Sequence, residues 1–338
     1  MKSERIRYID IFKGLLIILV VVHHAPLVCQ KFGNPYMDTY WANNIIIAFF
    51  MPAWFIATGY CTNFNKPFAQ YLWQNFKGIM IPCFTLYCIN HVLLCINTYL
   101  YGDPSWMTLS HWLNPGIRTF LRCGGFYWFL SALFISKLIF WFVAKLPKDI
   151  YQAAVCVLML IAGLYLYHTE IVPNIFFFQH ALVLTLFLLA GQMLKIYEKH
   201  ILSYSIFIAT AFFMTVLLMS YQNIPIPTVT RDITTTLQTT PLFVLLSILG
   251  SLTTWVISRR ITANRLLEYM GRGSLVMYAF NYVTLTLVAN TLVYALAPHD
   301  AALSILCFIL TIIISLALLT LFYWLLDKRW IRTIIGKF

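Results

Sequence analysis

The sequence predicts an all-α fold: a polytopic integral membrane protein of about ten transmembrane helices, with both termini in the cytoplasm. Hydrophobic residues make up 61% of the 338 residues and charged residues only 10%, whereas about 25% of a soluble domain is charged. The mean hydropathy is +0.80. Such a composition cannot be hidden in one water-soluble core, so the surrounding solvent must be lipid. The apolar residues also fall into ten runs, with basic residues concentrated on one side of them.

Each of the ten runs is long enough to cross about 30 Å of hydrocarbon at roughly 20 residues per helix. An α-helix is expected for each, because lipid leaves backbone groups no other partner. In the second run, Met51-Pro52 predicts a break or kink, and Ala57-Thr58-Gly59 favours close packing against a neighbour, which we expect to be the first helix. The runs cover residues 9–29, 41–62, 78–100, 125–145, 150–168, 173–195, 201–221, 239–258, 274–297 and 302–326.

The Lys and Arg residues predict the orientation. If the N-terminus is cytoplasmic and the runs alternate, cytoplasmic segments hold 18 basic residues and outer segments 4, with Lys137 left inside a run. This asymmetry follows the positive-inside rule, so the net charge of +12 reflects the membrane rather than a nucleic-acid partner. The basic start leads into the first run without a small-residue cleavage site, which predicts a retained span. One membrane domain over residues 1–338 is expected, with no separate soluble domain.

The eight cysteines are scattered, mostly within apolar runs, where they serve as small packing residues. The sequence contains no CxxC pair and no Cys/His set with zinc-ligand spacing. It therefore predicts no metal site.

The first run contains ionisable residues that apolar helices usually exclude. Lys13 and His24 are eleven residues apart, which places them about 20° apart around a helix and roughly 16 Å apart along it. Asp10 lies about 60° from Lys13, close to the same stripe, whereas His23 points about 100° away from His24. Histidine is the usual base for a hydroxyl nucleophile, and a cation at the cytoplasmic end suits phosphates. This spacing predicts a nucleotide-bearing thioester, with its phosphates at Lys13 and its arm reaching His24.

Structural explanations for these residues stay open. Lys13 can extend to lipid headgroups, and His24 can be a hydrogen-bonded structural histidine near the outer interface. Lys137, about twelve residues into its run, needs a partner or a wet cavity unless it reaches the inner side. The polar pair Gln179-His180 is more typical of contacts between helices than of catalysis.

One long outer connection, residues 101–124, is a candidate binding segment because loops of this length are often functional. Arg118 and Arg122 lie one helical turn apart in it, and Trp128 follows. These three residues either contact the acceptor or donor or anchor the chain at the interface. On the cytoplasmic side, Arg272 either binds a donor phosphate beside a helix N-terminus or adds one more inner charge.

Several blocks carry a resemblance to a known family. Lys13-x10-His24 in the first run and FFMPAWFIATGYC (49–61) in the second are the most specific. They resemble the acyltransferase-3 family of integral-membrane O-acyltransferases, many of which have Arg at the first position. Three further blocks resemble the same family: GGFYWFLSALFISKL (124–138), FLLAGQMLKIY (187–197), and YMGRGSLVMYAFNYV (269–283), which has Asn281 where the family has His.

The resemblance implies an enzyme that moves an acyl group, most often acetyl from acetyl-CoA, to a hydroxyl of a sugar, surface polysaccharide or glycolipid. It implies His24 as general base, with Lys13 and Asp10 at the catalytic site. Acyl-CoA is then a co-substrate, no bound cofactor is expected, and the location is the cell (inner) membrane. No serine stands at a nucleophile elbow, which favours direct transfer. The residues expected to bind substrate or donor are Arg118, Arg122, Trp128, Arg272, Asn281 and Tyr60.

Two other functions fit the same charged stripe. A transporter or flippase would use it to line a translocation path, although no inverted repeat is evident in the sequence. An acyl carrier would pass the acyl group to a separate outer enzyme. Product formation from labelled acetyl-CoA in isolated membranes distinguishes the enzyme from the transporter.

Overall fold

The computed structural model describes residues 6–30, 40–101, 127–222, 224–296, 301–328 and 332–336. Within these ranges the chain is helical, and the strand pairing is limited to an isolated bridge between Val229 and Ile233. The predicted all-α class is confirmed for this part of the chain.

Apolar helices coincide with all ten predicted runs. Three of them are shorter than the others: Ile45–Cys61, Trp128–Val143 and Ser205–Tyr221. The multi-pass architecture is therefore confirmed, whereas ten crossings and cytoplasmic termini stay predictions. Seven helices in the described ranges are long and apolar enough to cross a membrane: Arg7–Pro26, Phe68–Tyr101, Asp149–Thr169, Ile175–Ser203, Thr240–Arg260, Ser274–Leu296 and Ala302–Leu326.

The second run is broken, as Met51-Pro52 predicted. Helix α2 (Tyr40–Ile47) ends in a turn, and α3 (Phe50–Cys61) begins after it. Pro52 lies in the first turn of α3, where a missing backbone N–H costs least. The backbone N–H of Ala53 donates to the carbonyl of Phe49 at 2.9 Å, so the new helix starts immediately beyond the break.

The third run is longer than predicted. Helix α4 (Phe68–Asn75) continues through a π-helical segment, η1 (Phe76–Met80), into α5 (Ile81–Tyr101). The expected start at residue 78 is therefore wrong by ten residues. Polar residues in α4, among them Gln74 and Asn75, conceal this helical extension from a hydropathy pattern.

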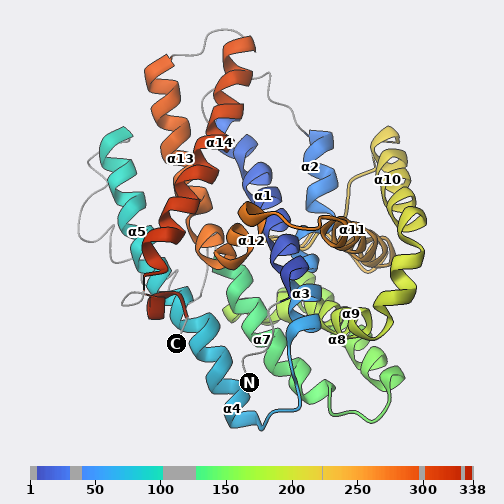
Figure 1. Ribbon diagram of the computed structural model, residues 1–338. Coiled ribbons are helices and arrows are strands. Elements are labelled where there is room, and N and C mark those ends of the chain that lie inside the picture. The colour runs from blue at the N-terminus through green and yellow to red at the C-terminus, as the bar shows by residue number, and fades with distance from the viewer. Residues whose placement is uncertain are drawn as a thin grey trace.

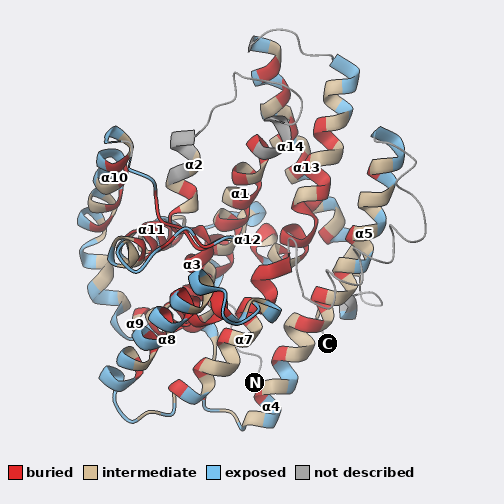
Figure 2. Cartoon of the chain, turned by 180° about the vertical axis from the view of Figure 1, so that it is seen from behind, coloured by how far each residue is buried: buried red, intermediate tan, exposed pale blue. Residues whose placement is uncertain are grey.

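Helix α1 (Arg7–Gln30) lies near the middle of the bundle, with α13 (Ser274–Leu296) and α14 (Ala301–Leu326) on one side and α10 (Ser205–Tyr221) and α11 (Thr240–Arg260) on the other (Figure 1). It packs against α11, α12 (Arg265–Arg272), α13 and α14. Figure 2 shows the buried residues gathered on the central helices. The remaining elements are α7 (Trp128–Val143), α8 (Asp149–Thr169), η4 (Ile175–Phe177), α9 (Phe178–Ser203) and η5 (Arg332–Ile335).

Glycines on both sides allow α3 and α9 to approach closely. A Cβ atom at Gly59 of α3 would overlap the carbonyl oxygen of Leu188 in α9, and one at Gly191 of α9 would overlap the carbonyl of Ile56. The predicted close packing is confirmed for Gly59, but its neighbour is α9 and not the first helix that was expected; α3 contacts α1 to a lesser extent. This packing fixes the position of α3 beside the cavities described next.

Candidate functional site

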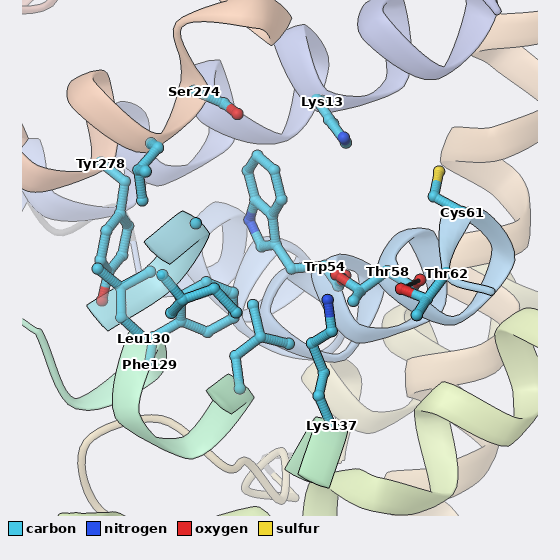
Figure 3. A pocket seen from close by; sticks show the side chains of 14 residues that line it. Lys13, Trp54, Thr58, Cys61, Thr62, Phe129, Leu130, Lys137, Ser274 and Tyr278 are labelled. Carbon is cyan, nitrogen blue, oxygen red and sulfur yellow. Dashed lines mark hydrogen bonds between the residues drawn. The ribbon is translucent and has the colours of Figure 1, made fainter. Parts of the chain in front are cut away.

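The first of two cavities contains Lys13, and we call it the Lys13 cavity. It has a volume of about 280 Å³ and lies between α1, α3, η1, α7 and α13. Lys13 of α1 and Lys137 of α7 reach into it from opposite sides (Figure 3). Its lining residues are Lys13, Trp54, Thr58, Cys61, Thr62, Gly78, Ile79, Phe129, Leu130, Leu133, Lys137, Ser274, Leu275 and Tyr278.

The chemistry of the Lys13 cavity suits an anion. It has two ammonium groups and no acidic residue among its described lining residues. The hydroxyls of Thr58 and Thr62 donate to carbonyls of Trp54 and Thr58, at 2.8 and 2.7 Å, so they add no free donors. The indole Nε1 of Trp54 is buried and has no hydrogen-bond partner among the described residues. A ligand with anionic oxygens can pair with the lysines, and Trp54 can donate to it.

Lys137 reaches a cavity, which is one of the placements that its position within an apolar run allowed. The side-chain nitrogen lies 6.0 Å from the centre of the Tyr71 ring, at the edge of the range for a cation–π contact. The Tyr71 hydroxyl donates to the Lys137 carbonyl at 3.2 Å. These contacts fix α7 beside α4 and direct the ammonium group toward Lys13.

The second cavity contains His24, and we call it the His24 cavity. Its volume is about 230 Å³, and it lies between α1, α3, α7, α13 and the connection between α10 and α11. None of its described lining residues is acidic. They are His23, His24, Phe50, Met51, Trp128, Thr230, Arg231, Tyr278, Asn281 and Tyr282.

The hydrogen bond of His24 determines which ring nitrogen is available as a base. Its Nδ1 lies 2.8 Å from the carbonyl oxygen of Val20, one turn earlier in α1. A carbonyl only accepts, so Nδ1 carries the proton and donates it. In the neutral ring Nε2 then holds the free lone pair. His24 can accept a proton from a hydroxyl in the cavity through Nε2.

His23 also reaches the His24 cavity, although the helical phase predicted that it points away. Its ring lies 4.7 Å from the His24 ring and 5.0 Å from that of Phe50, measured between centroids. Its Nδ1 donates to Oδ1 of Asn43 in α2. The side chain is buried, so His23 connects α1 to α2 while forming part of the cavity wall.

Asn281 brings an unsatisfied acceptor to the His24 cavity. Its Nδ2 donates to the Tyr278 carbonyl at 2.8 Å. Its side chain is 2% exposed, and Oδ1 has no hydrogen-bond partner among the described residues. A buried acceptor without a donor is costly, so a ligand hydroxyl in the cavity would relieve that cost. Asn281 thus lies where the sequence expected a binding residue.

Trp128 and Arg231 form another part of the His24 cavity. The buried Trp128 ring lies 5.4 Å from the ring of His180 in α9. His180 Nε2 donates to the Arg231 carbonyl at 3.0 Å, and Nδ1 accepts from Asn174 at 3.0 Å. The interhelical role predicted for His180 therefore extends to a loop. Sequence reasoning missed Arg231, which it treated only as one of four outer charges.

Tyr60 lies away from both sets of lining residues. Its hydroxyl donates to Glu198 Oε2 at 3.0 Å and lies 2.6 Å from the Tyr8 hydroxyl. Glu198 also accepts from Trp255 Nε1 at 3.0 Å and pairs with Arg259 at 3.2 Å. This cluster connects α1, α3, α9 and α11. The structure thus gives Tyr60 a packing position rather than a place at either cavity.

Two further predicted site residues, Asp10 and Arg272, are not among the described lining residues of either cavity. Asp10 is buried where α1 meets α12, and its backbone carbonyl lies against Gly271. Arg272 is exposed, with its guanidinium 5.6 Å from the Tyr269 ring centre. Arg118 and Arg122 lie outside the described residues.

The two cavities follow one another along the same helices, with Tyr278 lining both. In α1 and α13 the sequence runs from the Lys13 cavity to the His24 cavity. In α3 and α7 it runs the opposite way. The four helices therefore line two neighbouring cavities, the first with Lys13 and Lys137 and the second with His23, His24 and Arg231.

In a comparison with protein families, this chain matches a family described as an acyltransferase domain, of the acyltransferase-3 type. The match covers residues 6–324 and includes every residue that lines the two cavities. Neither the curated proteins nor the solved structures gave a match.

Proposed function

The chain belongs to the acyltransferase-3 family, whose domain it matches over nearly its whole length, and we propose that it is an O-acyltransferase of the cell membrane. In this proposal it moves an acetyl group from acetyl-CoA to a hydroxyl of a sugar, in a surface polysaccharide or a glycolipid. The observation that carries the proposal is the succession of two cavities with Tyr278 in both walls.

The Lys13 cavity is the proposed site of the donor's phosphates. Lys13 and Lys137 supply two positive charges from separate helices, and phosphate oxygens pair well with ammonium groups. Lys13 and His24 are eleven residues apart in α1, or roughly 16 Å along the helix axis. The donor's flexible thioester arm would cover that distance by passing Tyr278.

The chemical step then takes place at the His24 cavity. His24 Nε2 accepts the proton of the acceptor hydroxyl as its oxygen attacks the thioester carbonyl carbon. The tetrahedral intermediate collapses with cleavage of the carbon–sulfur bond, and the departing thiolate takes the proton back from His24. Direct transfer needs no acyl-enzyme, and the hydrogen bond from Nδ1 to Val20 keeps the ring in the required tautomer.

A substitution of His24 tests this function. In membranes supplied with labelled acetyl-CoA and the cell's own glycolipids and polysaccharides, His24→Ala should lower acetyl transfer by about 10²- to 10⁴-fold, the usual contribution of a general base. The protein should remain in the membrane in unchanged amount. His200→Ala, at an exposed position near the end of α9, is the matched control and should keep full activity.

Three outcomes contradict the proposal. Acetyl transfer that persists in His24→Ala would show that His24 is not the general base. The absence of any acetylated product from the unsubstituted chain would favour the transporter. Acetyl found on the protein but never on a sugar would favour the acyl carrier.

A further inference from the structure

Arg231 gives the His24 cavity a positive charge that the acetyl-transfer step does not use. It lines the cavity, and no described lining residue is acidic. Its side chain is exposed. In the part of the chain that the structure describes, its guanidinium forms no ion pair and no hydrogen bond. A free guanidinium that faces a binding cavity selects for an anionic ligand group.

The backbone around Arg231 is held in place from two directions. Val229 and Ile233 form an antiparallel bridge that closes the turn carrying Arg231. His180, buried in α9, donates to the Arg231 carbonyl at 3.0 Å. A fixed backbone lowers the entropy cost of bringing the guanidinium to a ligand. Arg231 can therefore select its ligand more strictly than a charged residue on a mobile loop could.

Asn281 supplies a second and independent indication of a ligand. Asn281 lines the same cavity, and its buried Oδ1 has no donor among the described residues. A hydroxyl is the group that satisfies such an acceptor. The Trp128 ring in the same wall offers an apolar surface of the kind against which sugar rings pack.

We propose that the acceptor is an acidic sugar, with its carboxylate or phosphate against Arg231 and a hydroxyl at Asn281. This inference rests on the proposed function, because it assigns the His24 cavity to the acceptor. Carboxylate and phosphate share the same recognition by guanidinium, and the test below separates them.

The test measures binding, so that it does not depend on catalysis. Purified protein in lipid nanodiscs is titrated calorimetrically with methyl glucoside, methyl glucuronide and methyl glucoside 6-phosphate. At least one of the two anionic sugars should bind about tenfold or more tightly than the neutral one. Arg231→Gln should remove that preference while leaving methyl glucoside binding unchanged, and Arg231→Lys should restore part of it. Arg260→Gln, which removes a charge at the end of α11, is the matched control and should keep the preference.

Equal binding of all three sugars, or binding of none, overturns the proposal. Equal loss of all binding in Arg231→Gln also overturns it, because that result indicates a structural role for the loop. The proposed function fails separately, through acetyl transfer that persists in His24→Ala, since that assay uses the cell's own acceptors.

Discussion

Successive side chains on a helix point about 100° apart, yet His23 and His24 both reach one cavity. Their hydrogen bonds explain why we expect His24, and not His23, to act as the base. His23 is bonded to Asn43 in another helix, whereas His24 is bonded to its own helix backbone at Val20. A bond within the helix orients the ring without joining it to a neighbour, so His24 keeps Nε2 available for a substrate.

The two lysines provide a test of the donor site at this scale. Lys13→Met and Lys137→Met should each raise the KM for acetyl-CoA roughly tenfold or more, because a hydrogen bond to a charged group is worth about 1.5–3 kcal/mol. The kcat should change much less, since neither lysine reaches the His24 cavity. Lys13→Arg should keep most of the affinity, because the charge remains.

Steady-state kinetics with varied acetyl-CoA measures these effects. Lys199→Met, at an exposed position near the end of α9, is the matched loss of charge and should leave the KM unchanged. A KM that stays constant in both cavity variants contradicts the donor assignment.

At the scale of the element, the break before α3 and its contact with α9 position the shared wall of the cavities. Phe50 and Met51, at the start of α3, line the His24 cavity, and Cys61, at its end, lines the Lys13 cavity. The sequence predicted this break from Met51-Pro52 and the close packing from the small residues, because both depend on local chemistry. It did not predict that Tyr60 faces Glu198, because that depends on the rotation of α3 against α9.

The contact between α3 and α9 predicts a stability change. Gly59→Ala should lower the free energy of unfolding by about 1–3 kcal/mol, the usual cost of overpacking, because its Cβ meets the Leu188 backbone, which cannot rotate away. Thermal unfolding in detergent measures the loss. Gly78→Ala is the matched control, since a Cβ there has no described atom within 4 Å. Equal melting temperatures for the two variants would contradict the close contact.

At the scale of the whole molecule, the hydropathy pattern predicted where the helices lie. It predicted their lengths less well, and the sequence identified only some of the residues that line the cavities. Lys13 and His24 were found from the sequence because one helix fixes their spacing. Lys137 and Arg231 reach the cavities through tertiary packing of α7 and of the loop after α10, which no local pattern specifies. Helices α1 and α3 run in opposite directions between the cavities, as expected if consecutive helices cross the membrane in opposite directions. Which ends face the cytoplasm stays a prediction.

Cysteine labelling tests that orientation together with the donor site. Cys61 is exposed and lines the Lys13 cavity, at the end of the second run that the basic residues place in the cytoplasm. In a chain whose other cysteines are replaced by serine, a membrane-impermeant maleimide should label Cys61 in inverted vesicles and not in right-side-out vesicles. Acetyl-CoA should slow the labelling, because the donor would occupy the same cavity.

Thr230→Cys in the chain without native cysteines is the matched probe of the other end, since Thr230 lines the His24 cavity. Its thiol should react in right-side-out vesicles, and acetyl-CoA added from the cytoplasmic side should protect it less than it protects Cys61. Labelling of Cys61 from the outer side would reverse the predicted orientation. Labelling of Cys61 at an unchanged rate in saturating acetyl-CoA would instead contradict the assignment of the donor to the Lys13 cavity. The experiment therefore tests the orientation and the donor site independently.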